Sequence, residues 1–113
     1  MIPRYTIFML LKAEPAWLRL SRRERNTIAE GALGAALAGL TVSHRHFDAE
    51  AFCGACSDVA VFETESLTDY YVAIERLRDT VIFSEPFFSV VSIIPALEDG
   101  FRNFERGALG NAA

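Results

Sequence analysis

Both histidines and both cysteines of the 113-residue chain lie in one short stretch, SHRHFDAEAFCGACSDV, residues 43–59. Histidine changes its charge near neutral pH and can therefore move protons. The pattern C-x-x-C is typical of redox-active cysteines and of zinc half-sites. The stretch is therefore an acid/base site, a metal or redox site, or ordinary sheet with a compact turn.

The H-x-H pattern favours acid/base chemistry. Alternation along a strand places His44, His46 and Asp48 on one face. Burying such groups without partners costs about 1–3 kcal/mol each, so they should line a wet cavity, contact one another or lie at an edge. We expect one histidine to act as a general base, Asp48 to orient it and Arg45 to stabilise an oxyanion. An exposed edge strand without a role is the alternative.

The two cysteines, Cys53 and Cys56, fall between two predicted strands. In thioredoxin-type proteins the reactive cysteine begins a helix, so this position argues against oxidoreductase chemistry. We interpret the segment as a turn with two buried thiols. A zinc site made of His46, Cys53 and Cys56 is the alternative, although a structural site needs a fourth ligand. We therefore expect no metal and no cofactor.

Composition indicates one globular domain over residues 1–113, with a flexible tail from about residue 101. The net charge of −4 argues against a nucleic-acid partner. A local cluster of Arg19, Arg22, Arg23 and Arg25 would either meet an anion or an acidic patch of a partner, or form a solvated face. The apolar run at 5–11 is too short to span a membrane, so we expect a cytoplasmic protein.

The pattern of apolar residues predicts four strands and two helices. Strands are expected at 5–12, 41–48, 58–64 and 89–97. The helices are expected to begin at Ser21, with a capping box to Glu24, and at Ser66. The order β-α-β-β-α-β predicts an α+β, ferredoxin-like fold, in which a four-stranded antiparallel sheet carries both helices on one face.

The first strand is apolar on both of its faces, and one layer of helices can bury only one of them. A second copy of the chain would cover the other face, so we expect a homodimer built as a dimeric α+β barrel. A small apolar metabolite is the expected ligand. Four aromatic side chains are predicted to wall its pocket: Trp17, Phe52, Phe62 and Tyr71.

Several segments, in order, carry a resemblance to a known family: YTIFMLLK followed by PAWL, FDAEAF at 47–52, DVAVFET at 58–64 and VVSIIP at 90–95. With these segments the chain resembles the darcynin family of small bacterial proteins. The resemblance implies a ferredoxin-like fold and no particular activity. The histidine pair and the C-G-A-C element look like departures from the family pattern or additions to it. The topology is also similar to that of dimeric α+β-barrel proteins, which include cofactor-free monooxygenases, lactone isomerases and haem-dependent relatives, although fold alone does not give function.

These observations predict a small-molecule-binding protein that catalyses cofactor-free proton transfer. Isomerisation, cyclisation or oxygenation of an enolisable metabolite, in specialised metabolism, would use His44 or His46 as the base. Two alternatives remain open at this point. One is a non-catalytic accessory protein that binds a ligand, zinc or copper, and the other is a dimeric interaction module without chemistry.

Overall fold

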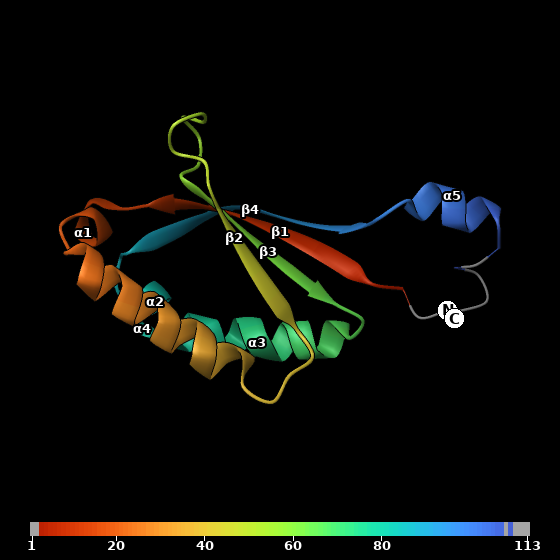
Figure 1. Cartoon of the computed structure of the whole chain (residues 1–113), viewed down its shortest axis with the longest axis horizontal. Helices are drawn as coiled ribbons and strands as arrows, with labels where there is room; N and C mark the ends of the chain where they lie inside the picture. Colours follow the sequence, from red (N-terminus) through yellow and green to blue (C-terminus); the bar gives the residue numbers. More distant parts are fainter. Residues whose placement is uncertain (1–2, 108, 110–113) are drawn as a thin grey trace.

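The computed structural model shows a four-stranded sheet whose one face is covered by helices (Figure 1). The structure describes residues 3–107 and 109. In chain order the elements are β1 (Tyr5–Ala13), α1 (Pro15–Leu18), α2 (Arg22–Leu37), β2 (Ser43–Asp48), β3 (Asp58–Thr64), α3 (Leu67–Asp79), α4 (Val81–Ser84), β4 (Phe88–Leu97) and α5 (Gly100–Glu105).

The strand order is β2-β3-β1-β4, and all neighbouring strands are antiparallel. This is the ferredoxin-like arrangement, so the predicted fold class is confirmed. The two most apolar strands, β1 and β3, take the central positions, as expected for strands with neighbours on both sides. The pairing of β1 with β4 shifts between Leu10 and Leu11, which leaves Val91 as a bulge.

The predicted helix starts are confirmed by their caps. The Ser21 hydroxyl accepts from the Glu24 backbone N–H at 3.1 Å, and the Glu24 carboxylate accepts from the Ser21 N–H at 2.9 Å. At the start of α3, the Ser66 hydroxyl accepts from the Asp69 N–H at 3.1 Å. Helix α2 ends before Gly39, whose φ of 74° lies in the left-handed region that favours glycine.

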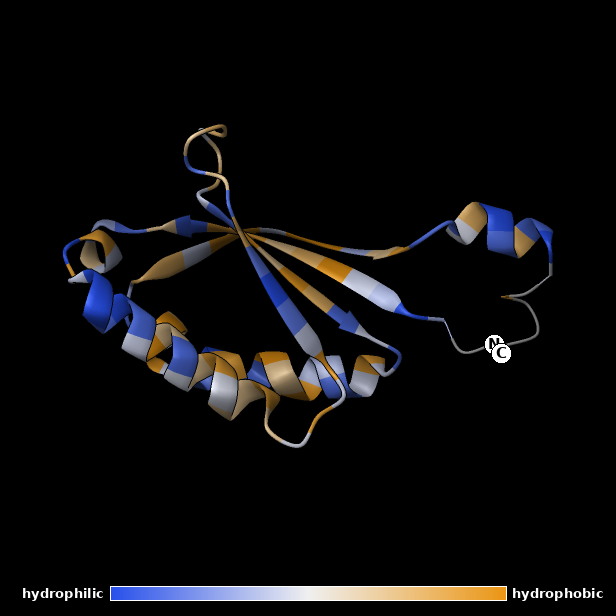
Figure 2. Cartoon of the chain, in the orientation of Figure 1, coloured by the Kyte–Doolittle hydropathy of each residue, from blue (hydrophilic) through white to orange (hydrophobic). Residues whose placement is uncertain are grey.

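The hydrophobic core lies between the sheet and helices α2, α3 and α4. In β1, Ile7, Met9 and Leu11 point toward the helices and are buried. Phe8 and its same-face neighbours point to the opposite side of the sheet. No helix within residues 3–107 covers that side (Figures 1 and 2). We call these two sides the covered face and the open face.

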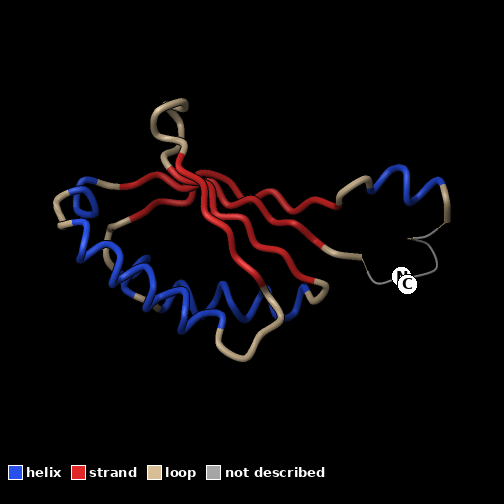
Figure 3. The backbone as a smooth tube through the Cα atoms, in the orientation of Figure 1, coloured by secondary structure: helices blue, strands red, loops and turns tan. Residues whose placement is uncertain are grey.

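Three short helices lie in segments where no helix was predicted. Pro15 begins α1, because proline is pre-organised for the first helical position. The aromatic segment before β4 contains α4. The tail expected from residue 101 is helical as α5, and it stands beyond the end of the sheet (Figure 3). Residues 108 and 110–113 of that tail lie outside the described residues. In the described part of the chain, no helix combines the length and the apolar character that a membrane span requires.

Candidate functional site

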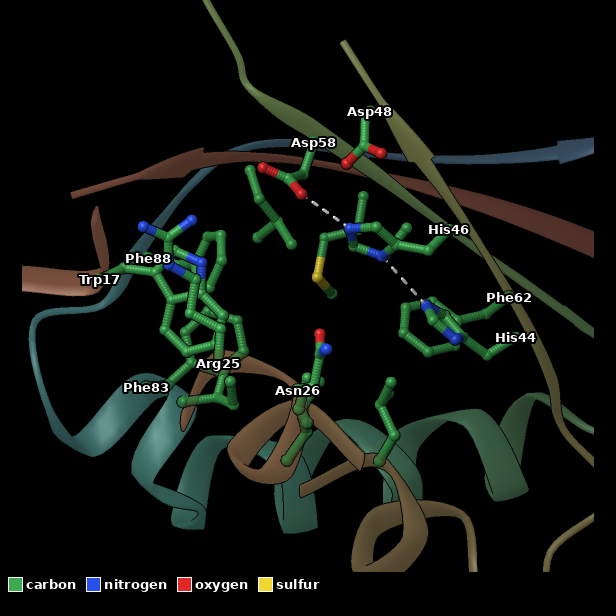
Figure 4. Close-up of a pocket in the computed structure, with 17 residues that line it drawn as sticks. Trp17, Arg25, Asn26, His44, His46, Asp48, Asp58, Phe62, Phe83 and Phe88 are labelled. Carbon is green, nitrogen blue, oxygen red and sulfur yellow. Dashed lines mark hydrogen bonds and ion pairs between the residues drawn. The ribbon is translucent and has the colours of Figure 1, made fainter. Parts of the chain in front are cut away.

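A cavity of about 380 Å³ lies between the covered face of the sheet and the helices (Figure 4). Most of its wall is apolar and consists of Met9, Leu11, Trp17, Ala29, Leu33, Ala60, Phe62, Leu77, Ile82, Phe83 and Phe88. Its polar residues come from three elements: Arg25 and Asn26 on α2, His44, His46 and Asp48 on β2, and Asp58 on β3. A mostly apolar cavity with a few converging polar groups is the usual form of a small-molecule site.

The register of β2 turns the histidines toward this cavity. His44 pairs with Phe62, His46 with Ala60 and Asp48 with Asp58. Because Ala60 and Phe62 belong to the buried core, their partners in β2 share the covered face. The predicted grouping of His44, His46 and Asp48 on one face is therefore what the structure shows.

A chain of hydrogen bonds joins the two histidines to Asp58. His46 Nε2 lies 2.8 Å from Asp58 Oδ2, and His46 Nδ1 lies 3.3 Å from His44 Nε2 (Figure 4). The hydroxyl of Ser57 donates to Asp58 Oδ1 at 2.6 Å. The His46 side chain is 39% exposed and that of Asp58 only 16%, so the anchoring carboxylate is the more protected member of the pair.

The electrostatics disfavour a proton on His44. Burial, together with the nearby charge of His46, lowers the pKa of His44 to about 4. Burial alone would raise the pKa of Asp58, but the hydrogen bonds from His46 and Ser57 and the charge of His46 outweigh it, and the net pKa is lowered. At neutral pH, His44 is therefore neutral and Asp58 is a carboxylate.

The carboxylate also determines the tautomers of a neutral pair. Because Asp58 can only accept, His46 Nε2 carries the proton that it donates. His46 Nδ1 then accepts from the Nε2–H of His44, and the remaining ring nitrogen of His44, Nδ1, keeps a lone pair. The three side chains can thus accept a proton at one end and hold the resulting positive charge beside the carboxylate.

Two of the predicted catalytic roles are corrected. Arg45 points to the open face, where it pairs with Glu63 at 2.9 Å and its guanidinium lies 5.7 Å from the centre of the Phe47 ring. It does not reach the cavity, because odd and even positions of a strand face opposite sides. Asp48 lines the cavity, but the carboxylate that holds His46 is Asp58.

The sequence interpretation missed Asp58 as well as Arg25 and Asn26. Asp58 stands opposite Asp48 in the register, a signal that requires the pairing of β2 with β3 to be known. Arg25 belongs to the arginine cluster at the helix start, which the sequence predicts either to meet an anion or an acidic patch or to form a solvated face. Its Nη2 donates to the Leu18 carbonyl at 2.7 Å and its Nε to the Leu20 carbonyl at 3.2 Å, which holds the side chain at the cavity.

The predicted aromatic wall is half correct. Trp17 and Phe62 line the cavity, and the buried ring of Phe62 lies 5.3 Å from that of His44. Phe52 is 92% exposed in the loop between β2 and β3, and Tyr71 is 65% exposed on α3. Neither side chain lines the cavity, which is closed instead by Phe83 and Phe88.

One set of side chains could hold a metal ion. Ligand atoms of His46, Asp48 and Asp58 lie within 4.8 Å of one another, a nitrogen and carboxylate set that suits a divalent cation. The predicted alternative of His46 with Cys53 and Cys56 is not among the sets of three found within residues 3–107 and 109. Of the two thiols expected to be buried, only Cys56 is; Cys53 is exposed.

These features define a ferredoxin-like α+β protein with a polar and aromatic cavity under its sheet. The chain belongs to the darcynin family, because the family model "Darcynin, domain of unknown function" matches residues 1–112. A darcynin of Chromobacterium violaceum is 56% identical over 64 residues, covering 57% of this chain and 81% of that protein. A darcynin homolog of Streptomyces avermitilis is 35% identical over 103 residues, covering 88% of this chain and 83% of that protein.

The fold is also similar to that of solved chlorite dismutases from Candidatus Nitrospira defluvii. Two crystal structures of mutant enzymes match with TM-scores of 0.75 and 0.71, each at 21% sequence identity. They cover 94% and 84% of this chain, but the chain spans only 45% and 40% of the length of those proteins. At this identity the likeness shows the fold, and the enzymes' activity does not transfer with it.

Proposed function

We propose that the protein binds a small, largely apolar metabolite and transfers a proton on it without a bound cofactor. The observation that carries this proposal is the histidine pair, which is held by a half-buried carboxylate at the wall of an apolar cavity. Paired titratable groups with opposed environments are the usual arrangement for acid/base catalysis. The reactions that fit are isomerisation, cyclisation or oxygenation of a substrate with an enolisable C–H bond.

In this proposal His44 is the general base. Its Nδ1 takes a proton from substrate carbon, while its Nε2 proton moves to His46 Nδ1. The positive charge then rests on His46 beside Asp58, where the carboxylate stabilises it. General base catalysis of this kind contributes about 10²–10⁴-fold in rate.

Arg25 is the group that would stabilise the developing enolate oxygen. Two of its N–H donors are used by the carbonyls of Leu18 and Leu20, and a guanidinium has about five. The remaining donors, on a side chain that lines the cavity, can bind an oxyanion. Arg25 thus takes the role that the sequence interpretation gave to Arg45.

The test is hydrogen–deuterium exchange at carbon. A panel of apolar β-diketones and β-keto esters is incubated in D₂O with the protein, and loss of the α-proton signal is followed by NMR. We expect wild type to accelerate exchange of at least one compound, and His44→Ala and His46→Ala each to slow it by about 10²-fold or more. Arg45→Gln, on the open face, is the matched control and should exchange at the wild-type rate.

Three results would contradict the proposal. Equal exchange rates for wild type and His46→Ala would remove the histidines from the chemistry. A haem absorption band in purified protein would replace the cofactor-free mechanism. One equivalent of tightly bound zinc or copper, lost in Asp58→Asn, would favour the metal-binding alternative at His46, Asp48 and Asp58.

We also propose that a second copy of the chain covers the open face. Phe8, Phe47, Val91 and Ile94 are exposed large apolar side chains on β1, β2 and β4. Phe8 and Ile94 are direct partners in the sheet, so they form one patch on the open face. Such a patch can pack against its own copy about a two-fold axis. The ion pair of Arg45 with Glu63 is closed within each chain and would bring no unpaired charge into that contact.

Sedimentation of wild type and Ile94→Arg tests the assembly. We expect wild type to sediment as a dimer. In the variant, the dissociation constant of the dimer should rise about 100-fold, because an unpaired charge is costly in an apolar interface. Val81→Arg, which replaces an exposed apolar residue on the helical side, is the matched control. A monomeric wild type, or equal effects of the two substitutions, would contradict the proposal.

A further inference from the structure

The loop between β2 and β3 projects away from the sheet (Figures 1 and 3). At its base the Ala49 N–H donates to the Ser57 carbonyl at 2.7 Å. Ser57 is fastened to β1, since its N–H donates to the Leu11 carbonyl at 2.8 Å and its hydroxyl accepts from the Ala13 N–H at 2.7 Å. The tip can therefore change its internal bonding while its two ends stay in place.

This loop brings the only two cysteines of the chain together. The Sγ atoms of Cys53 and Cys56 lie 3.7 Å apart as free thiols, and the Cys56 S–H donates to Cys53 Sγ. The two differ in access, because Cys53 is exposed and Cys56 is buried. An exposed thiol next to a protected one is the arrangement of an attacking and a resolving cysteine.

We propose that Cys53 and Cys56 form a thiol–disulfide exchange site, in which Cys53 attacks a low-molecular-weight disulfide and Cys56 resolves the product. The disulfide RSSR is itself the oxidant, so the reaction needs no other electron acceptor. The Cys53 thiolate attacks one sulfur of the disulfide RSSR, releases RS⁻ and forms a mixed disulfide with the other half. Cys56 then gives its proton to solvent and attacks Cys53 Sγ, which releases the second RS⁻. The protein dithiol is oxidised to the Cys53–Cys56 disulfide, and RSSR is reduced to two RSH.

The turn supplies what a helix N-terminus supplies in thioredoxin-type proteins. The backbone N–H groups of Cys56 and Ala55, followed by the Cys56 thiol, lower the pKa of Cys53. The position of the pair between two strands, which argued against redox chemistry in the sequence, is thus compensated by local N–H donors.

The surroundings favour a small disulfide that carries charges of both signs. A cavity of about 350 Å³ lies beside the pair, and its charged lining consists of two cations, Lys12 and Arg25, and three carboxylates, Asp48, Glu50 and Asp58. Glutathione disulfide has carboxylates and ammonium groups that could meet these side chains. This cavity shares Arg25, Asp48 and Asp58 with the cavity that contains the histidines. Neither cysteine lines the histidine cavity, so substituting the cysteines removes no group of the acid/base site.

Alkylation of the wild-type chain tests the asymmetry of the pair. Reduced protein is treated with limiting iodoacetamide at pH 7, and the modified peptides are quantified by mass spectrometry. We expect Cys53 to react at least 10-fold faster than Cys56, because it is both exposed and more readily ionised. Equal rates, or faster reaction at Cys56, would overturn the proposal.

Incubation with glutathione disulfide tests the exchange. Wild type should lose two hydrogens and form the Cys53–Cys56 disulfide. Cys56→Ser should accumulate a stable adduct of one glutathione at Cys53, and Cys53→Ser should react at least 10-fold more slowly than Cys56→Ser. Circular dichroism establishes that each variant is folded. Disulfide formation in wild type tests the proposal even if a variant does not fold. Absence of the intramolecular disulfide in wild type, or an adduct at Cys56, would overturn the proposal.

Discussion

The two faces of the sheet are built from the same strands and differ in what covers them. On the covered face, helices bury an apolar core around a cavity that contains two histidines and two carboxylates. On the open face, Phe8, Phe47 and Ile94 are exposed, and the polar side chains Arg45 and Glu63 pair with each other. The covered face thus combines an apolar core with hydrogen-bonded polar groups, whereas the open face exposes large apolar side chains to solvent.

This difference separates two tasks within one small domain. The covered face has partners for its polar atoms, and among the described residues no buried side-chain nitrogen or oxygen lacks a hydrogen bond. The polar side chains of this face are therefore satisfied within one chain. The open face has apolar area but no cover of its own, so its stability should depend on association.

The largest expected effect is on the free energy of unfolding, and its dependence on protein concentration should differ between the two faces. Phe62→Ala should lower the free energy of unfolding by about 3–5 kcal/mol at every concentration, because the ring is 1% exposed. Phe8→Ser, on the open face, should lower the free energy of unfolding more at high protein concentration than at low. The reason is that the wild type is stabilised by dimer formation, which this substitution weakens. Urea denaturation over a 100-fold range of concentration measures both. A concentration-independent loss for Phe8→Ser would contradict the division of tasks.

The fold could be predicted from the sequence because its signals are local. The capping box at Ser21 and the cap at Ser66 specify where α2 and α3 begin, and alternation specifies the strands. The short helices α1, α4 and α5 were missed, since segments of four to six residues leave too little periodicity to detect.

The site could be predicted only in part, because half of it depends on register. His44 and His46 share a face by alternation within one strand. Asp58 reaches His46 only through the pairing of β2 with β3, and Arg25 only through the packing of α2 over the sheet. Phe52 and Tyr71 were assigned to the cavity on residue type alone, which does not indicate the direction of a side chain.

The next effect compares two carboxylates at one end of the covered face. Asp58→Asn should lower the free energy of unfolding by about 1–3 kcal/mol, because it removes the charge that His46 and Ser57 both contact. Asp48→Asn, at the paired but exposed position, should change it by less than about 0.5 kcal/mol. Thermal and urea unfolding at pH 7 measure both variants. A larger loss for Asp48→Asn would reassign the anchoring role to Asp48.

A smaller effect concerns pH. Because the pKa of His44 is lowered from 6.5 to about 4 in the folded chain, the unfolded chain binds its proton more tightly. The contribution of neutral His44 to the free energy of unfolding is fully present above about pH 6.5 and is lost as the pH falls toward 4. The loss should be about 1 kcal/mol, after allowing for the exposed part of the ring. His44→Gln should flatten this part of the profile in urea denaturation. An unchanged slope between pH 6.5 and 4 would mean that another group carries it.

The smallest effect checks the residues that the structure removes from the site. Phe52→Ser and Tyr71→Ser should each change the free energy of unfolding by less than about 0.5 kcal/mol, since 92% and 65% of these side chains already contact water. Binding of the fluorescent probe 8-anilinonaphthalene-1-sulfonate to the cavity should likewise stay at the wild-type value. Leu33→Trp, which fills the cavity wall, should reduce it. If Phe52→Ser lowered binding as Leu33→Trp does, the loop would close over the cavity when it is occupied, and the boundary between site and surface would lie further out than the free chain indicates.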